Sequence, residues 1–240
     1  MTSVLPSTRN MAAAATALDT ATSQQLSVRS LVTDTAGRFI AELQRGFLSD
    51  RSIAVGALAQ LRRGAGKLPS QTPELWGITG TDQLLQHELL ADSETRAERA
   101  EAGHFIAVTL YALHQQSQRS PMHRPKADLG EAVRRLMPRG DIEETIRRRF
   151  VRLGTAATAD ILAYRLREIV SLMRGAGVPL DYGRLAGQLY LAQTPDGMHQ
   201  VRREWGRSFH TYKPDDTDQS STQSPGAEPP DKDGTSTEQP

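Results

Sequence analysis

Apolar side chains recur at intervals of three and four residues along most of this chain, which is the spacing of a buried helix face. One such set covers residues 31–47, and a shorter set covers residues 53–61. Residues 94–118 predict the longest helix, with a charged first half and an apolar second half that we expect to be buried on most sides. A Gly/Pro-rich stretch at residues 64–73 precedes Leu75 and Trp76, which we expect to fold back onto the core.

A second group of helices is predicted after the segment SPMHRP at residues 120–125, which interrupts the periodic pattern. Apolar stripes of helical spacing then cover residues 129–137, 142–153, 161–173, 185–191 and 201–209. Asp181 is expected to cap the fourth of these helices. No segment has the alternating, β-branched pattern of a strand. The sequence therefore predicts an all-α protein with two small helical-bundle domains, residues 29–122 and 123–212.

The two flanks of this body lack the apolar surface that a packed core requires. Residues 213–240 contain one alanine as their single hydrophobic residue. Residues 1–28 contain an Ala-rich patch, and Arg9 is the one basic residue that precedes it. We predict a disordered leader over residues 1–28 and a disordered acidic tail over residues 213–240. A cleaved secretion signal is the alternative for the leader. No apolar run approaches the roughly 20 residues of a membrane span.

The sequence contains no complete set of residues for catalysis or for metal binding. It has no Cys, which excludes thiol catalysis and Cys-based zinc sites and fits a cytoplasmic protein. The HE pair at residues 87–88 begins the zinc motif HExxH, but position 91 is Ala. The GAGK at residues 64–67 lacks the first Gly and the Ser or Thr of a phosphate loop. His104 is expected to form a surface pair with Glu101. We therefore expect a protein that is not an enzyme, with no metal and no cofactor.

Positive charge is concentrated in one part of the chain. The 240 residues include 29 Lys and Arg against 28 Asp and Glu, a net charge of +1. Residues 113–152 hold ten basic side chains against five acidic ones, whereas residues 213–240 hold two against seven. Such a concentration favours binding to a polyanion, because each neutralised phosphate releases counterions. The alternative is an ordinary solvated helix surface in a chain with 25 Arg and only 4 Lys.

The spacing of the arginines favours contact with the nucleic-acid backbone. Arg134 and Arg135 fall on one predicted helix and residues 147–149 on the next, so both groups can face outward together. Arg62 and Arg63 end an earlier helix, where the alternative role is to complement the helix dipole. Aromatic residues are not interleaved with the arginines, so the sequence does not indicate base stacking. We expect phosphate contacts without sequence readout.

Six segments of the body carry a family resemblance in consistent order. They are ALAQLRRGAG (57–66), PELW (73–76), ALHQQSQ (112–118), HRPKADLGEAVRRL (123–136), the stretch 146–190 that begins IRRRFVRLG, and VRREWGRSF (201–209). With these segments the chain resembles the CasB family, the small subunit of type I-E CRISPR Cascade complexes. The flanks before residue 30 and after residue 212 lie outside the resemblance.

The resemblance implies an all-helical, two-domain, non-enzymatic subunit of an antiviral complex. Its partners would be a second copy of itself, the other Cascade subunits, the guide RNA and the target DNA with its displaced single strand, and no membrane. Because R-loop formation is close to energetic balance, a few backbone contacts can stabilise the R-loop. The binding residues that family similarity nominates are Arg62, Arg63, Arg134, Arg135, Arg148 and Arg149, and those that charge and position alone nominate are Arg119, Arg124 and Lys126.

Other residues receive structural or modulating roles. Asp128 and the Glu143-Glu144 pair are acidic residues among the basic ones, so we expect a narrower basic patch than in other members of the family. One hypothesis is that the acidic tail lies near the basic face and competes weakly with non-specific nucleic acid. The alternative function is a helical protein-interaction scaffold whose arginines are only surface charge. The side chains assigned to the core are Trp76, Phe150, Leu166, Tyr182 and Trp205.

Overall fold

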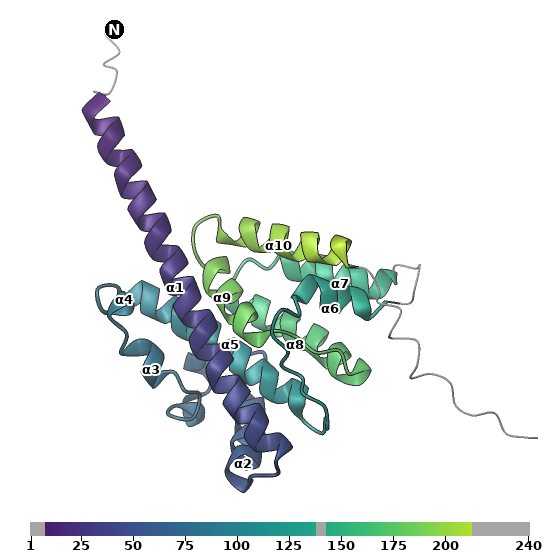
Figure 1. The fold of residues 1–240 in the computed structure, drawn as a ribbon. Helices are drawn as coiled ribbons and strands as arrows, with labels where there is room; N and C mark the ends of the chain where they lie inside the picture. The colour runs from purple at the N-terminus through teal and green to yellow at the C-terminus, as the bar shows by residue number, and fades with distance from the viewer. Residues whose placement is uncertain (1–7, 138–142, 213–240) are drawn as a thin grey trace, which may run out of the picture.

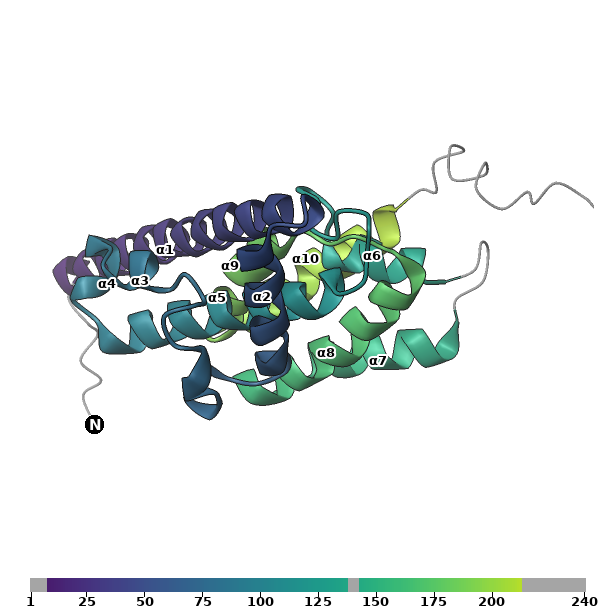
Figure 2. The same ribbon diagram turned by 90° about the horizontal axis from the view of Figure 1, so that it is seen from below.

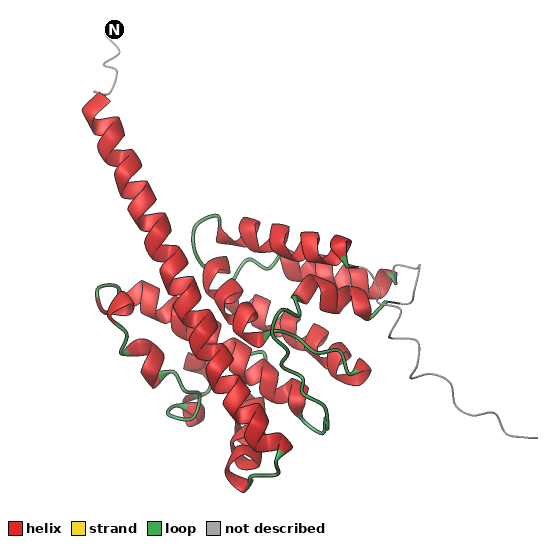
Figure 3. Ribbon diagram, viewed as in Figure 1, coloured by secondary structure: helices red, strands yellow, loops and turns green. Residues whose placement is uncertain are grey.

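A computed structural model of the chain describes residues 8–137 and 143–212. Within these ranges the chain consists of helices joined by loops and turns, with no strand (Figure 3), so the all-α prediction is confirmed. No helix of the described part is long and apolar enough to cross a membrane. The α-helices are α1 (Thr8–Leu48), α2 (Ser52–Leu61), α3 (Asp82–Leu85), α4 (Glu88–Ala91), α5 (Glu94–Gln115), α6 (Leu129–Arg135), α7 (Glu144–Gly154), α8 (Ala159–Ala176), α9 (Tyr182–Ala192) and α10 (Gly197–Thr211), and the 3-10 turns are η1 (Arg62–Gly64), η2 (Pro69–Gln71) and η3 (Pro73–Leu75).

Helix α5 lies at the centre of the molecule. Residues 105–112 of this helix are all buried, as their unbroken apolar character predicts. Figure 2 shows α1 along one side and α7 and α8 along the opposite side, with α5 and α9 between them. The α5 and α9 backbones pack so closely at Gly103 that a Cβ there would lie 2.9 Å from the carbonyl oxygen of Ala186. The sides of α5 thus contact α1, α8 and α9, which explains its burial.

Helix α1, not α5, is the longest helix, and it includes much of the predicted leader (Figure 1). Val28 is fully buried, and the side-chain amide of Gln25 donates to Thr194 Oγ1 at 2.6 Å. The packed body therefore begins before residue 29, and the predicted boundary is wrong. The reason is that alanine has the strongest helix propensity, although it supplies little of the apolar periodicity on which the prediction rested. Residues 1–7 and the acidic tail from residue 213 lie outside the described residues.

The predicted core is confirmed for most of its members. Leu166 and Tyr182 are fully buried, and Trp205 is 2% exposed. Phe150 is half-buried and stacks on Phe209, with 5.5 Å between ring centroids. The prediction is wrong for Trp76, which is 67% exposed. The neighbouring Leu75, 1% exposed, fills the core instead.

The predicted surface pair of His104 and Glu101 is also wrong. His104 is fully buried, and its Nε2 lies 2.9 Å from the carbonyl oxygen of Thr79. Burial lowers the pKa of His104, so the ring is neutral at physiological pH. His104 thus fixes the chain between η3 and α3 to the central helix, a role that its sequence neighbours do not indicate.

Buried side chains from both predicted domains belong to one cluster, which includes Ile40, Leu110, Leu166 and Leu185. Helix α9 of the second predicted domain packs against both α1 and α5 of the first. Whether residues 29–122 and 123–212 fold independently is a separate property, and the two-domain division stays a prediction.

Candidate nucleic-acid interface

Helix α2 ends in the η1 turn, where Arg62 and Arg63 are exposed. The turn packs against the core, because Gly64 is buried against the side chains of Leu75, Thr109 and Phe105. A Cβ at Gly64 would lie 2.7 Å from Leu75 Cδ1 and 2.8 Å from Thr109 Cγ2. The absence of a side chain at this position therefore allows the turn to pack against the core while the two arginines face solvent.

A cation from a distant part of the chain joins this turn. Gly66 has a φ of +83°, in the left-handed region that favours glycine. The side chain of Arg167 on α8 lies over it, with Cδ 2.9 Å from the position that a Cβ of Gly66 would occupy. We call Arg62, Arg63, Lys67 and Arg167 the η1 cluster. All four of these side chains are exposed, and none forms an ion pair with a described residue.

The loop between α5 and α6 carries the three cations that charge and position alone nominate, Arg119, Arg124 and Lys126, and all three are exposed. The side chain of Gln44 on α1 holds the middle of this loop. Its Nε2 donates to the carbonyl oxygen of His123 at 3.1 Å, and its Oε1 accepts from the N–H of His123 at 2.8 Å. The loop is thus fixed to α1 through both backbone groups of one residue.

The same loop is bound to the beginning of α9. The N–H of Lys126 donates to Asp181 Oδ2 at 2.7 Å, while Asp181 Oδ1 accepts from the N–H of Arg184 and caps α9 as predicted. His123 Nδ1 accepts from the N–H of Tyr182 at 3.2 Å. Burial lowers the pKa of His123, although Asp181 opposes this effect, and the neutral ring can serve as acceptor. The loop therefore presents its cations from an ordered backbone.

Arg134 and Arg135 lie at the end of α6 and are half-buried. Arg135 forms an ion pair with Glu131 one turn earlier, at 2.9 Å. Its guanidinium carbon also lies 5.2 Å from the centre of the Tyr212 ring, a cation-π distance. Arg135 is therefore engaged within the fold, between α6 and the end of α10.

The arginines of α7 are partly neutralised by an acid on the same helix. Glu144 pairs with Arg147 at 2.8 Å and with Arg148 at 2.9 Å. Hydrogen bonds from these two arginines lower the pKa of Glu144 to about 2, so it stays charged. Arg148 is nevertheless 73% exposed in its side chain, and Arg149 is half-buried. Glu144 thus neutralises part of the basic surface of α7.

Helix α8 contacts both the η1 cluster and the α5–α6 loop. Its Arg167 belongs to the η1 cluster, and its Arg174 donates from Nε to the carbonyl oxygen of Gln116 at 3.1 Å, at the start of the α5–α6 loop. Seven residues apart, Arg167 and Arg174 lie on the same side of α8, about 10 Å apart along its axis. Helix α7 also packs against α8. The structure thus links the η1 cluster to the loop along α8, whereas the Arg134-Arg135 pair lies beside α10.

Arg167 and Arg174 belong to this surface, although the sequence does not nominate them. Both arginines lie outside residues 113–152, where positive charge is concentrated, and each reaches its group from another part of the chain. Asp128 was expected to dilute the basic surface, but it is 4% exposed and forms a 2.9 Å ion pair with Arg184. Among the described residues, no group of three or more His, Asp or Glu side chains is arranged to hold a metal ion.

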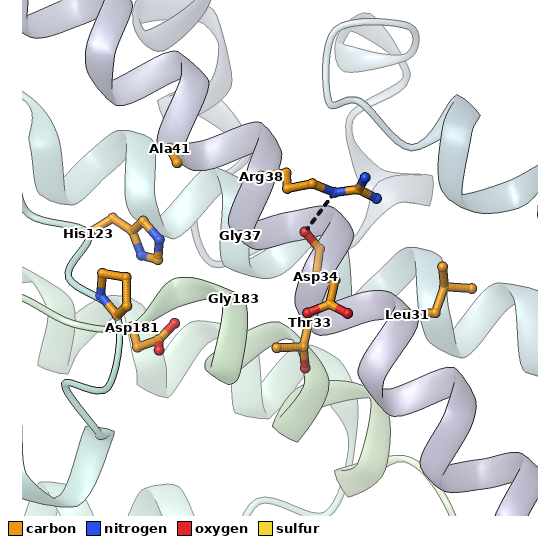
Figure 4. A pocket seen from close by; sticks show the side chains of 10 residues that line it. Leu31, Thr33, Asp34, Gly37, Arg38, Ala41, His123, Asp181 and Gly183 are labelled. Carbon is orange, nitrogen blue, oxygen red and sulfur yellow. Dashed lines mark hydrogen bonds between the residues drawn. The ribbon is translucent and has the colours of Figure 1, made fainter.

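A separate groove of about 610 Å³ lies between α1 and α9, beside the α5–α6 loop (Figure 4). Its charged residues are Asp34, Arg38 and Asp181, and Arg38 Nε donates to the carbonyl oxygen of Asp34. Two carboxylates against one guanidinium make this groove a poor site for phosphate. None of the nominated arginines or Lys126 lines it.

The chain matches the family model described as CRISPR-associated protein Cse2 over residues 57–210, a range that includes all nine nominated cations. It is similar to a solved structure of CasB from Thermobifida fusca, with 47% identity and a TM-score of 0.65 over 75% of this chain and 98% of that one. A chain of a structure described as a CRISPR RNA-guided surveillance complex has 17% identity and a TM-score of 0.52, over 75% of this chain and 93% of that chain, and supports the fold alone. No curated protein matches the chain. The family model matches most of the helical body, and the 47% identity to CasB indicates the same family. The chain therefore belongs to the Cse2 (CasB) family.

Proposed function

We propose that this chain is the non-catalytic small subunit of a type I-E CRISPR Cascade ribonucleoprotein, in which it binds the backbone of nucleic acid. Membership of the Cse2 family supports this proposal, and so does the shared fold with a chain of an RNA-guided surveillance complex. The partners are then a second copy of the chain, the other Cascade subunits, the guide RNA and the target DNA.

The η1 cluster is the observation that carries the proposal. Arg62, Arg63, Lys67 and Arg167 are exposed around one turn and pair with no described acid, whereas Arg135 and Arg148 already have carboxylate partners. A phosphate that reaches the η1 cluster does not have to displace an intramolecular ion pair. The η1 cluster is therefore the strongest anion-binding feature of the candidate interface.

Backbone contacts of this kind suit a subunit that retains an R-loop. The heteroduplex formed is about as stable as the duplex it replaces, so a few phosphate contacts to the displaced strand shift the balance. Such contacts carry no sequence information, which allows the same subunit to act on any target. Guide pairing then supplies the specificity, and this chain supplies affinity.

A helical interaction scaffold is the second candidate function. Three apolar side chains are exposed where α1 meets α2: Leu48 at 39%, Ile53 at 90% and Val55 at 40%. Exposed apolar surface of this kind is typical of contact with another protein. Salt dependence separates the two candidates, because phosphate binding weakens steeply with salt and apolar contact does not.

The test is the affinity of the full chain for single-stranded DNA over a range of salt concentrations. We expect log K to fall with log[salt] by roughly 0.7 for each phosphate contact. The double variant Arg62→Ala/Arg63→Ala should bind more weakly and with a smaller slope. The control is Arg38→Ala/Arg45→Ala, which removes the same charge from exposed positions on α1. An equal loss in both double variants, or a response that is flat in salt, would contradict the proposal.

The assembled complex provides the second test. The proposal expects co-purification of the chain with the other Cascade subunits and guide RNA when its native operon is expressed. Arg148→Ala/Arg149→Ala should weaken retention of the R-loop while the circular dichroism of the isolated variant is unchanged. Lost helicity would instead assign these two arginines a structural role.

A further inference from the structure

Trp76 is a large apolar side chain that the fold holds in solvent. It is 67% exposed, yet its neighbour Leu75 is 1% exposed and Thr79, three residues later, is 3% exposed. Trp76 is therefore not part of a frayed surface loop. A short segment that is anchored on both sides presents its ring outward.

The anchor before Trp76 is the η3 turn. Leu75 packs against Gly64 from beneath the η1 turn, and its N–H donates to the carbonyl oxygen of Thr72 at 3.0 Å. The N–H of Trp76 donates to the carbonyl oxygen of Pro73 at 3.1 Å. The backbone of Trp76 is thus hydrogen-bonded within a turn that Leu75 anchors in the core.

The anchor after Trp76 is the buried pair Thr79 and Thr81. Their hydroxyl oxygens lie 3.0 Å apart, and the carbonyl oxygen of Thr79 contacts Nε2 of the buried His104 at 2.9 Å. With both sides fixed, the backbone that carries Trp76 is ordered before any ligand arrives. An ordered backbone loses little conformational entropy on binding, which favours affinity.

The fold brings Trp76 to the η1 cluster. The contact between Leu75 and Gly64 joins the two turns, with Trp76 following the first residue and Arg63 preceding the second. Residues 62–77 hold three cations, Arg62, Arg63 and Lys67, against one acid, Glu74. An exposed indole beside a cationic turn is the combination that proteins use to bind single strands, with bases stacked on the ring and phosphates on the cations.

We propose that Trp76 is a stacking platform for an unpaired base of a single strand whose phosphates contact Arg62 and Arg63. The proposal rests on the proposed nucleic-acid-binding function and adds a base contact to it. Because every base has a π face, stacking on Trp76 adds affinity with little preference for sequence. It also favours a single strand over a duplex, whose bases are already stacked on each other.

The test uses the full chain and its two tryptophans. Trp205 is 2% exposed and donates from Nε1 to Gln188 at 2.8 Å, so Trp76 is the tryptophan that a strand can reach. We expect an oligothymidylate strand to quench tryptophan fluorescence, and the quenching to disappear in Trp76→Ala. The affinity for this strand should fall about 5- to 150-fold in Trp76→Ala and recover in large part in Trp76→Phe.

An abasic strand of the same length is the matched ligand, because it keeps the phosphates and lacks the bases. We expect Trp76→Ala to bind the abasic strand as well as the unmodified chain does. An equal loss of affinity for both strands in Trp76→Ala would overturn the stacking platform. An unchanged affinity for oligothymidylate would also overturn it, and lost binding to another Cascade subunit would then assign Trp76 to a protein contact.

The Arg62→Ala/Arg63→Ala variant keeps the two proposals distinguishable. If it loses affinity for both strands while Trp76→Ala binds both normally, the stacking platform is wrong and the proposed function stands. If the unmodified chain binds neither strand, both proposals are wrong.

Discussion

Arg29 on α1 holds the carboxylate of Glu204 on α10 through two hydrogen bonds, of 2.8 Å from Nη1 to Oε1 and 2.7 Å from Nη2 to Oε2. Gln188 on α9 donates to the same carboxylate at 2.9 Å and accepts from Trp205 Nε1 at 2.8 Å. Burial raises the pKa of Glu204, but the hydrogen bonds from Arg29 and Gln188 outweigh this effect and lower it below its usual value. One charged network therefore joins α1 to the consecutive helices α9 and α10 at the other end of the helical body.

Arg29→Ala should destabilise the fold by about 2 kcal/mol at pH 7, because it leaves a partly buried carboxylate without its cation. Urea unfolding followed by circular dichroism measures this loss. The control is Arg203→Ala, an exposed position on α10, which should change the free energy of unfolding by less than about 0.5 kcal/mol. Equal free energies of unfolding for the two variants would show that the network adds nothing to stability.

The stability of the protein should fall as the pH is lowered below about 6.5, in part because of His114. Burial lowers the pKa of His114 to about 4, whereas a histidine in an unfolded chain titrates near 6.5. Between these values the unfolded state binds more protons than the folded state, so acid favours unfolding. From pH 7 to pH 5 this one residue should cost about 2 kcal/mol.

His114→Gln should therefore make the free energy of unfolding less dependent on pH between pH 7 and pH 5, measured by urea unfolding at both pH values. The buried His104 and His123, whose pKa values burial also lowers, keep part of the dependence. His199→Gln supplies the control, because it makes the same substitution at an exposed position. A similar effect of both substitutions would argue against a special role for His114.

Gly130→Ala should destabilise the contact between α6 and α10 by at least about 3 kcal/mol. A Cβ at Gly130 would lie 2.7 Å from the backbone nitrogen of Phe209 and would overlap the carbonyl oxygen of Trp205. Backbone atoms cannot rotate away, so the two helices must separate. Gly206→Ala is the matched control on α10, because nothing lies within 4 Å of its Cβ position, and it should stabilise by about 0.5 to 1 kcal/mol. Thermal unfolding would detect both changes, and equal midpoints would contradict the packing argument.

Glu144→Gln should increase the affinity for single-stranded DNA at low salt, because it releases Arg147 and Arg148 from their ion pairs. The expected gain is about 1.5- to 5-fold, the range that follows from the energies of exposed ion pairs. Fluorescence anisotropy with a labelled strand measures it. Glu88→Gln on α4 makes the same change of charge at another exposed position. If both substitutions raise the affinity equally, the gain comes from net charge and not from the released arginines.

Several features of the fold could be predicted because they depend on residues close together in the chain. The buried second half of α5 follows from its unbroken apolar run, and the cap at Asp181 follows from its position before an apolar stripe. Helix α10 covers the apolar stripe at residues 201–209 that predicts it. The pairing of Glu131 with Arg135 and of Glu144 with Arg148 could also have been predicted, because each pair is four residues apart on one helix.

Other features depend on which segments meet in space. Trp76 and Leu75 are neighbours that both have large, mainly apolar side chains, and only the packing of Leu75 against Gly64 decides which of them is buried. The contact of His104 with Thr79 does not follow from its neighbours in the sequence, because Thr79 comes from another segment. Arg167 joins the η1 cluster for the same kind of reason.

The sequence by itself determined the helical class, the positions of most helices, the concentration of positive charge and the resemblance to the CasB family. Periodicity and charge are local properties that each segment carries wherever it lies. Only the tertiary structure decided that Arg62 and Arg63 have Arg167 beside them and that Trp76 stands in solvent next to this cationic turn. These relationships arise from contacts between distant segments, and such contacts follow from how the helices pack rather than from any residue's neighbours in the chain.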